Sequence, residues 1–458
     1  EYLTYPSKTL VTKQIGFQHF PGVTICNLNQ IRDSKITKKL IDPLATLGEF
    51  KEDDKWNVSV QEGLPDPYLT KRTKLSISIA HKLKAYEERS LWGHQIEDFI
   101  LHCAFGGREC NRAEDFKHIW NDVYGNCFTF SGGKLTQKHQ QKVSNESGPI
   151  DGLSLILATE PEEHIKSLTS SKGVRMLIHP AFDMPFPEQG GISVPAGVEA
   201  SVAISKENYL HLGEPYHPCN DDESNKYGYA YSSVACQKVC YQEMILKRCL
   251  CADPTLPLGP RFPVCSINDI YSNEYHCYTE TMDRFESEEY VCNCPVPCNE
   301  TRYHPVISMA SWPSPKHKKF IDLVLEPLNV PYEIQKLASI KVYYTELAQR
   351  VFTEEPTFTI VDFLTYMGGL SAMFIGVSLL TLFEFIELIL TLCLIPWVHF
   401  NPWPEDIKEE KPRPQEDGPP LPRPATTKDI DARITDLPDM RNRPMPKSLG
   451  LSKAVASS

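Results

Sequence analysis

An apolar run near the C-terminus carries residues whose types and spacing could handle ions. Residues 363–383 contain no charged side chain, and about 20 apolar residues in a helix cross the hydrocarbon core of a bilayer. A Gly-Val-Ser tripeptide at 376–378 interrupts this run, and Glu384 and Glu387 follow about two turns later. Because ionisable groups at membrane depth usually face a protein interior or a water-filled path, the pattern predicts a pore lining.

The tripeptide has the chemistry of a cation filter. Gly376 would let the backbones of neighbouring helices approach closely. Carbonyl groups that lose their helical hydrogen bonds at the interruption, together with the Ser378 hydroxyl, could replace part of the hydration shell of a cation. Small residues also pack membrane helices against one another, and acids near the end of a span can snorkel toward the headgroups. The residues by themselves leave these alternatives open.

Cysteines and glycosylation sequons place residues 1–356 outside the cell. Of the 15 cysteines, 14 precede the apolar run and Cys393 lies inside it. An even set upstream of a membrane span is typical of disulfides in an oxidising compartment. Acceptor sequons begin at Asn57, Asn145 and Asn299. Close cysteines can also bind zinc, but no Cys-x-x-Cys pair occurs, so we predict disulfides and no metal or other cofactor.

Several function classes are disfavoured. The net charge of −12 argues against nucleic acid as a partner, because phosphate binding requires a basic surface. Neither Gly-x-Ser-x-Gly nor His-Glu-x-x-His occurs, and histidines such as His102 and His179 have no evident partners in the sequence. We therefore predict that the chain is not an enzyme.

The segments before the apolar run predict a mixture of strands and helices. Residues 1–26 have an extended pattern, residues 90–102 have a helical one, and residues 127–212 are rich in predicted strands. Residues 226–247 predict one helix, on which Cys236 and Cys240 share a face. Individual strands are predicted at 152–157, 173–179, 301–308 and 340–346.

The last segment, residues 401–458, is rich in proline, poor in aromatic residues and balanced in charge. This composition predicts a disordered, cytosolic tail. Pro419–Pro424 would fit an SH3 groove in a polyproline II conformation. A single match of this kind more often has no defined partner.

Several motifs together resemble the degenerin, epithelial sodium channel and acid-sensing channel family. They are Tyr5-Pro6, residues 20–29, the cysteine block 292–303, residues 312–314, Gly368-Gly369, and the tripeptide followed by Glu384. The resemblance covers residues 1–400. It implies an α+β fold with a disulfide-rich, hand-like ectodomain of palm, β-ball, finger, knuckle and thumb, and a transmembrane helix.

The resemblance also implies a domain order. Residues 1–356 would form the ectodomain, with the thumb and its cysteine ladder at 219–298, and residues 357–400 would form the second transmembrane helix. In this family each subunit of a trimer has two membrane helices. The chain would begin just after the first one, so that the N-terminal cytosolic segment and first helix lie outside this sequence.

A disulfide pattern follows from the same resemblance, with Cys393 left free. The implied bridges are Cys26–Cys127, Cys103–Cys110, Cys219–Cys298, Cys236–Cys294, Cys240–Cys292, Cys249–Cys277 and Cys251–Cys265.

The likeness assigns roles to the pore residues. Gly376, Val377 and Ser378 match the selective, narrowest part of the pore, although Val377 is larger than the usual middle residue and leaves the degree of sodium selectivity open. Glu384 matches the inner-mouth acid, and Glu387 is a weaker candidate.

At the outer mouth, Thr365 matches a small gating residue, where added bulk should bias the channel open. Gly368 and Gly369 follow it. Tyr366 stands where family members often carry an acid, which puts calcium block in doubt.

The resemblance implies a voltage-independent, amiloride-sensitive, sodium-selective channel in the plasma membrane. Residues 4–8 contain none of the histidine typical of acid-sensing members. Acidic runs at 160–163, 221–223 and 286–289 could sense protons, but such runs are more often solvated surface. We therefore expect an extracellular ligand such as a neuropeptide, ahead of proton gating and constitutive opening.

Two further expectations complete this interpretation. Tyr5 and Tyr216 are expected to couple the thumb to the membrane segment by aromatic packing. The alternative from another class is a single-pass cell-surface receptor with a disulfide-rich ectodomain, which an upstream cleavable signal in place of a membrane helix would indicate.

Overall fold

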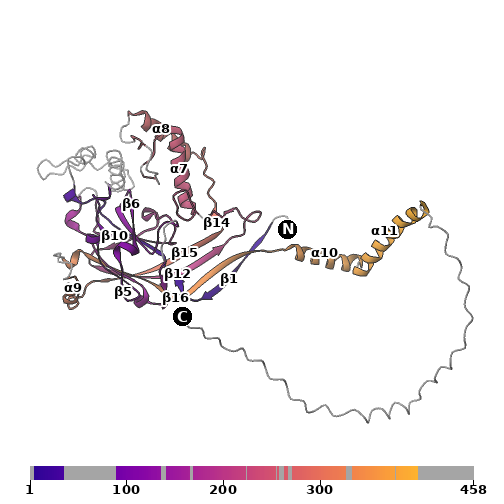
Figure 1. Ribbon diagram of the computed structural model, residues 1–458, viewed down its shortest axis with the longest axis horizontal. Helices are drawn as coiled ribbons and strands as arrows, with labels where there is room; N and C mark the ends of the chain where they lie inside the picture. The colour runs from indigo at the N-terminus through magenta and orange to yellow at the C-terminus, as the bar shows by residue number, and fades with distance from the viewer. Residues whose placement is uncertain are drawn as a thin grey trace, which may run out of the picture. The chain divides into compact units, whose positions relative to one another are not determined.

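The computed structural model divides the chain into two units, Glu1–Leu370 and Ser371–Ser458, and Figure 1 shows its elements. The residues it describes are 5–35, 89–135, 141–165, 169–222, 224–253, 255–256, 263–266, 271–325, 333–376 and 378–400. Predictions for Asn57, Val377, the tail at 401–458 and Pro419–Pro424 lie outside these residues.

The larger sheet joins seven strands in the described part of the first unit, in the order β15-β12-β16-β9-β4-β5, with β1 also paired to β16. These strands are β1 (Ser7–Ile15), β4 (Ile100–Phe105), β5 (Arg108–Glu109), β9 (Leu153–Ala158), β12 (Val198–Leu210), β15 (Asn299–Ser311) and β16 (Leu337–Pro356). Strand β16 is long enough to pair with β9 through its first residues and with β1 through its last ones. It therefore connects the core of the sheet to the segment that precedes the apolar run (Figure 1).

Alternation of apolar and polar residues explains how this sheet buries one face. Ala200, Val202 and Ile204 of β12 are fully buried, and so are Ile340 and Val342 of β16. Side chains at every second position point to the same face of a strand. The two strands run parallel to each other, so their buried residues form one continuous core.

The smaller sheet has the strand order β11-β10-β3-β7-β6. Its strands are β3 (Gly22–Asn27), β6 (Phe116–Asn121), β7 (Gly125–Phe130), β10 (Gly173–His179) and β11 (Ile192–Pro195). Every residue of β3 and β7 is buried, and Cys26 lies directly opposite Cys127 in their register. The predicted strand at 173–179 is confirmed.

Two helices form an arm stapled by disulfides. Helix α7 (Ser233–Cys249) and helix α8 (Asn273–Glu286) lie side by side (Figure 1). Each begins at a serine cap, because the hydroxyls of Ser232 and Ser272 accept hydrogen bonds from backbone amides in the first turn.

The predicted helix at 226–247 therefore begins too early. Residues 225–229 form a turn in which the amide of Asn225 donates to the carbonyl of Tyr229 at 2.8 Å. Gly228 adopts a positive φ of 82° in this turn. Such a backbone is incompatible with a right-handed helix, so the helix starts only at the Ser232 cap.

The helix predicted at 90–102 is also much shorter in the structure. Helix α4 covers only Ile96–Phe99, and Ile100 already belongs to β4, which pairs with β9. Pairing with a buried strand outweighs the local helical periodicity at this point. By contrast, the extended pattern is confirmed over the described residues 5–26, and the strands predicted at 152–157, 301–308 and 340–346 correspond to β9, β15 and β16, although β16 continues well past the predicted end, to Pro356.

The remaining short elements connect these parts. They are β2 (Gln18–His19), β8 (Val143–Ser144), β13 (Cys219–Asn220), β14 (Val296–Pro297), α5 (Arg112–Asp115), α6 (Pro187–Gly190), α9 (Lys318–Leu325), η2 (Asp33–Lys35), η3 (Pro149–Asp151), η4 (Pro161–Glu163) and η6 (Ile334–Lys336). The structure thus has the α+β class and the disulfide-rich ectodomain expected from the sequence.

Candidate pore site

The apolar run forms two helices that are separated at the predicted filter. Helix α10 covers Ile360–Ile375 and helix α11 covers Leu379–Phe400. Within the described residues, no single helix is both long and apolar enough to cross a bilayer. The bent pair Ile360–Phe374 and Leu379–Ile395 passes this test when its two members are taken together, by length and composition.

Local capping chemistry explains where the helices separate. Gly376 has a φ of +71°, and a glycine in this conformation is the commonest way to end a helix. The amide of Ser378 donates to the Thr381 hydroxyl at 2.8 Å, and the amide of Thr381 donates to the Ser378 hydroxyl at 3.2 Å. Ser378 therefore caps α11.

This cap changes the hydrogen bonding of the preceding turn. In a continuous helix, the amide of Ser378 would bond to the carbonyl of Phe374, four residues earlier. Here that amide donates to the Thr381 hydroxyl instead, so the Ser378 amide is not available to the Phe374 carbonyl. A carbonyl released in this way can coordinate a cation.

The predicted inner-mouth acids lie on α11. Glu384 and Glu387 are both exposed, and their spacing of three residues places them on neighbouring positions of one helix face. The described side chains around them, from Leu379 to Ile395, are also exposed. An exposed apolar surface this extensive is typical of an interaction surface.

The predicted gating residues lie on α10. The Thr365 hydroxyl donates to the carbonyl of Val361 at 2.8 Å, and Tyr366 is exposed. A Cβ atom added to Gly368 or Gly369 would meet no atom within 4 Å. These four residues therefore have free surface in the single subunit.

Helix α10 starts with a second reciprocal cap. The Thr359 amide donates to the Asp362 carboxylate at 3.0 Å, and the Asp362 amide donates to the Thr359 hydroxyl at 3.1 Å. Immediately before it, the Thr357 amide donates to the Pro6 carbonyl at 2.8 Å. The N-terminal segment is thereby hydrogen-bonded to the start of α10.

The two tyrosines expected to couple the arm to the membrane segment are in contact. The ring centroids of Tyr5 and Tyr216 lie 5.7 Å apart in an edge-to-face arrangement, a geometry that aromatic rings favour. Tyr5 precedes β1, and Tyr216 lies in the loop between β12 and β13. Their role in gating stays a prediction.

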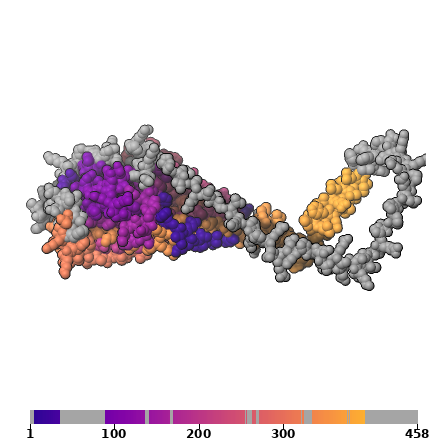
Figure 2. Space-filling view, turned by 60° about the horizontal axis from the view of Figure 1, so that its bottom comes forward, coloured from indigo at the N-terminus to yellow at the C-terminus, as the bar shows by residue number. Residues whose placement is uncertain are grey.

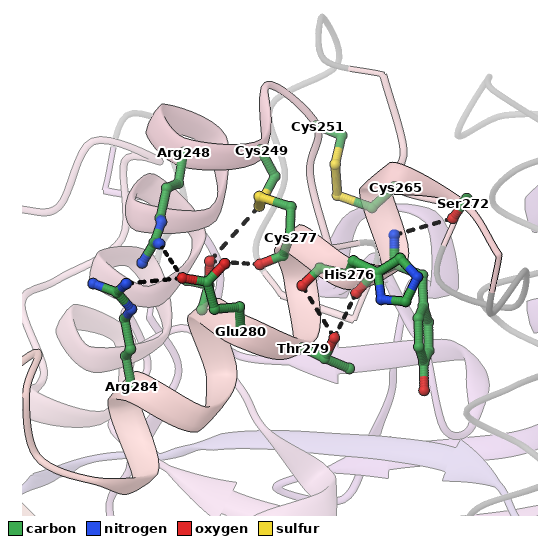
Figure 3. The surroundings of a disulfide bond; sticks show 12 residues. Arg248, Cys249, Cys251, Cys265, Ser272, His276, Cys277, Thr279, Glu280 and Arg284 are labelled. Carbon is green, nitrogen blue, oxygen red and sulfur yellow. Dashed lines mark hydrogen bonds and ion pairs between the residues drawn. A yellow bond between two sulfur atoms is a disulfide. The ribbon is translucent and has the colours of Figure 1, made fainter.

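All seven implied disulfides are present, and Cys393 is free. Cys236 and Cys240 of α7 pair in antiparallel order with Cys294 and Cys292. Figure 3 shows the far end of the arm, where Cys249–Cys277 links α7 to α8.

An ionic bridge supports the same end of the arm. Glu280 of α8 lies between Arg248 and Arg284 (Figure 3), with nitrogen-to-oxygen distances of 2.7 and 2.8 Å. Both arginines also donate to the hydroxyl of Tyr290. The arm therefore combines covalent staples with a shared carboxylate instead of a large apolar core.

Glu160 corrects the interpretation of its acidic run as solvated surface. Its carboxylate pairs with Arg32 and lies 2.5 Å from Nδ1 of His94, and its side chain is 18 % exposed. Burial opposes ionisation, but the bonds from His94 and Arg32 lower the pKa of Glu160 below its ordinary value. In the other runs, Asp221, Asp222 and residues 286–289 are exposed, as expected.

His179 also has partners that the sequence did not reveal. Its ring is buried, with Nε2 2.8 Å from the Thr24 hydroxyl and Nδ1 2.7 Å from the Pro180 carbonyl. Burial lowers the pKa of His179 to about 4. Thr24 lies on a neighbouring strand and is distant in sequence, so no local pattern could have indicated this contact.

The remaining predicted modification and metal sites can be placed. Asn145 and Asn299 are exposed, so both sequons are accessible, and glycosylation stays a prediction. Among the described residues, Cys219, Asp221 and Cys298 bring potential metal ligands together. Because the two sulfurs are joined in a disulfide, they cannot act as thiolate ligands.

Comparison with known proteins gives a consistent set of relatives. The epithelial sodium channel subunit beta of Xenopus laevis is 30% identical over 343 residues, which cover 72% of this chain and 52% of the relative. The alpha subunit from the same species is 29% identical over 319 residues, covering 68% and 50%. Degenerin mec-10 of Caenorhabditis briggsae is 30% identical over 336 residues, covering 71% and 45%.

The chain thus spans about half the length of these curated relatives. A family model described as "Amiloride-sensitive sodium channel" matches residues 1–388, a range that includes both sheets, the arm, the tripeptide and both candidate acids. A family of channels agrees with the expectation that the chain is not an enzyme. The chain belongs to the amiloride-sensitive sodium channel family, which includes the epithelial sodium channels and the degenerins.

Proposed function

We propose that this chain is a subunit of a trimeric, voltage-independent, sodium-selective channel of the plasma membrane that amiloride blocks and an extracellular ligand opens. One observation carries the proposal: the family match extends to residue 388 and so includes the capped break between α10 and α11. Sodium is then the permeating ion and not a resident cofactor. A neuropeptide is the favoured ligand, and proton gating and constitutive opening are the alternatives.

In this proposal α10 and α11 together form the second membrane span, and three copies surround the pore. Gly376, Val377 and Ser378 form the selectivity filter of this pore, in which backbone carbonyl groups and the Ser378 hydroxyl replace part of the hydration shell of the ion. Glu384, with Glu387 in a lesser role, concentrates cations at the inner mouth by electrostatic attraction. Thr365 lies at the gate, and Tyr366 stands at the outer mouth, where family members often carry the acid that is associated with calcium block.

Exposed apolar side chains on the larger sheet support contact between subunits. Leu10 and Val11 of β1 are 47% and 55% exposed, and Val306 and Met309 of β15 are 69% and 50% exposed. Figure 2 shows β1 in indigo at the surface. Exposed apolar patches of this kind mark interaction surfaces, so identical or homologous subunits are the proposed partners here.

The other proposed partners contact other parts of the chain. Lipid surrounds the outward faces of α10 and α11, amiloride enters the pore from outside, and an SH3 domain would bind Pro419–Pro424. The ectodomain is residues 1–356, with the thumb at 219–298, and residues 401–458 form the cytosolic tail.

The experiment is a recording from cells that express the full-length protein. We expect an inward sodium current that amiloride blocks when the activating peptide is applied. Thr365→Trp should give current without a ligand, because a bulky side chain at the gate disfavours closing. Thr365→Ser, which keeps the hydroxyl and adds no bulk, is the matched control and should still need the ligand. Normal surface expression without current across a peptide library, pH steps and the Thr365→Trp variant would contradict the proposal.

A further inference from the structure

Two histidines and one carboxylate meet where the larger sheet approaches α10. Glu354 lies near the end of β16, and His211 and His217 lie in the loop that follows β12. The Nδ1 atoms of His211 and His217 are 3.1 and 3.5 Å from the two carboxylate oxygens of Glu354. The Leu212 amide also donates to Glu354, at 3.0 Å.

The cluster is partly shielded from water. The side chains of His211 and Glu354 are each 18% exposed, whereas that of His217 is 54% exposed. Nε2 of His211 is buried and has no hydrogen-bond partner in the described part of the chain. An ion pair in such a place is screened less by salt than one on the open surface.

The charged groups on the adjacent elements have partners of their own. Arg302 binds Glu300 at 2.7 Å, the Tyr209 hydroxyl donates to Glu207 at 2.9 Å, and Lys8 lies 3.5 Å from Glu355. The Tyr209 ring stacks against His211, with centroids 6.3 Å apart. In the described part of the chain, the ion pairs of Glu354 come only from the two imidazoles.

The cluster also touches the route from the arm to the pore. The loop that carries both histidines also carries Tyr216, whose ring contacts Tyr5. Glu354 stands six residues before the first residue of α10. A change in how tightly this loop is held on β16 therefore acts at the start of the candidate pore helix.

We propose that His211, His217 and Glu354 form a proton-dependent clamp that holds the 211–217 loop on β16 and so regulates the channel proposed above. The regulatory part rests on that proposed function, whereas the clamp itself does not. Histidine is the side chain whose charge ordinarily changes between about pH 5 and 8. A neutral His211 gives the carboxylate one hydrogen bond, whereas protonation of both imidazoles adds two ion pairs.

The sign of the effect follows from the state of the carboxylate. Burial opposes ionisation of Glu354, but the hydrogen bonds from the Leu212 amide and from His211, with the nearby imidazole charge, lower its pKa below the ordinary value. Glu354 therefore stays charged to a lower pH than an unpaired glutamate. Acidification strengthens the clamp across the histidine range, and the clamp is lost only when Glu354 itself becomes protonated at a lower pH.

Hydrogen exchange of the full-length protein in detergent tests the clamp without any current. The His211→Gln/His217→Gln variant is compared with the unmodified protein at the same pH, so that the intrinsic chemistry of exchange cancels. At each pH the measured quantity is the exchange rate of the 211–217 segment in the double variant divided by the rate in the unmodified protein. We expect this ratio to be about fivefold larger near pH 5.5 than near pH 7.5. Glu354→Gln, which keeps the shape and removes the charge, should abolish the same difference.

A matched control and a milder variant complete the design. His276 is exposed on α8, and His276→Gln should leave the pH difference unchanged. If the double variant fails to fold, His217→Gln alone alters the more exposed partner and should still reduce the difference. Equal protection of the loop at both pH values, or an unchanged pH difference in Glu354→Gln, would overturn the clamp.

Current recordings then separate the clamp from the proposed channel. In the Thr365→Trp background, current should change with external pH across the histidine range, and the double variant should lose that change. Current with the same pH dependence in the double variant would overturn the regulatory role. Absence of current in every background, together with intact pH-dependent exchange, would contradict the channel and leave the clamp standing.

Discussion

Ser378 and Thr381 each donate a backbone amide to the other's side-chain hydroxyl, at 2.8 and 3.2 Å. Together with the positive φ of Gly376, this exchange ends one helix and starts the next at the predicted filter. The chemistry is local, because glycine is suited to end a helix and serine to begin one. The family likeness predicted an interruption here, and capping supplies a physical reason for it.

Removing the Ser378 hydroxyl should destabilise the cap at the start of α11 and should also lower the sodium selectivity. Ser378→Ala loses an N-cap, which costs about 1 kcal/mol of helix stability, and it removes a proposed ligand for the ion. We expect the ratio of sodium to potassium permeability to fall, as measured from reversal potentials in mixed ions. Ser378→Thr keeps a capping hydroxyl and should retain most of the selectivity; equal ratios in both variants would contradict this role.

The contact between Tyr5 and Tyr216 should be energetically coupled to opening. An edge-to-face pair contributes about 0.5–1.5 kcal/mol beyond its buried area, so each alanine variant should shift the ligand concentration for half-maximal current. In a double-mutant cycle the two effects should be less than additive. Tyr216→Phe keeps the ring and serves as the control. Strictly additive shifts would show that the contact plays no part in gating.

The disulfides should differ in how much they stabilise the fold. Cys26–Cys127 closes a separation of 101 residues, and an isolated loop of that size corresponds to about 4–5 kcal/mol in the chain-entropy model. Cys240–Cys292 lies inside the loop that Cys236–Cys294 already closes, so its removal relaxes the unfolded chain much less.

Paired serine variants measure this difference. Replacing both cysteines of Cys26–Cys127 should lower the unfolding temperature far more than replacing both cysteines of Cys240–Cys292. Thermal unfolding of purified protein under non-reducing conditions gives the comparison. A larger loss for the inner rung would contradict the loop argument.

Acid should destabilise the smaller sheet through His179. Its pKa is lowered to about 4 in the folded protein, whereas an unfolded histidine has a pKa near 6.5. The unfolded state therefore binds the proton first, and stability falls as pH drops from about 6.5 toward 4, by about 3 kcal/mol at most. The unfolding temperature measured against pH should fall less in His179→Asn than in the unmodified protein. An equal fall in both would mean that other groups cause the acid loss.

The sequence predicted those features whose causes are local or whose spacing is distinctive. Strands such as 173–179 follow from runs of buried residues between glycine and proline, and the cysteine pairs follow from the family likeness. Helix ends were less predictable, because the start of α7 depends on the turn at 225–229 as well as on the Ser232 cap.

Contacts between distant segments could not be predicted. Glu160 pairs with Arg32, and His211 meets Glu354 across 143 residues, and neither pair leaves a local pattern. Only the tertiary fold brings such groups together, which is why an acidic run that looked like solvated surface contains a partly buried ionic partner. The predicted filter and acids, by contrast, lie in one short segment whose spacing suggested them, and their roles stay predictions.

The most direct test of the central claim is whether an ion in the water-filled path reaches residue 378. Ser378→Cys should be made in a Cys393→Ser background, which removes the free cysteine of α11. Cadmium is then applied from the external side while current is flowing. We predict block of the current in Ser378→Cys and none in the Cys393→Ser background alone. A conducting Ser378→Cys channel that cadmium leaves unaffected would contradict the assignment of this break as the filter.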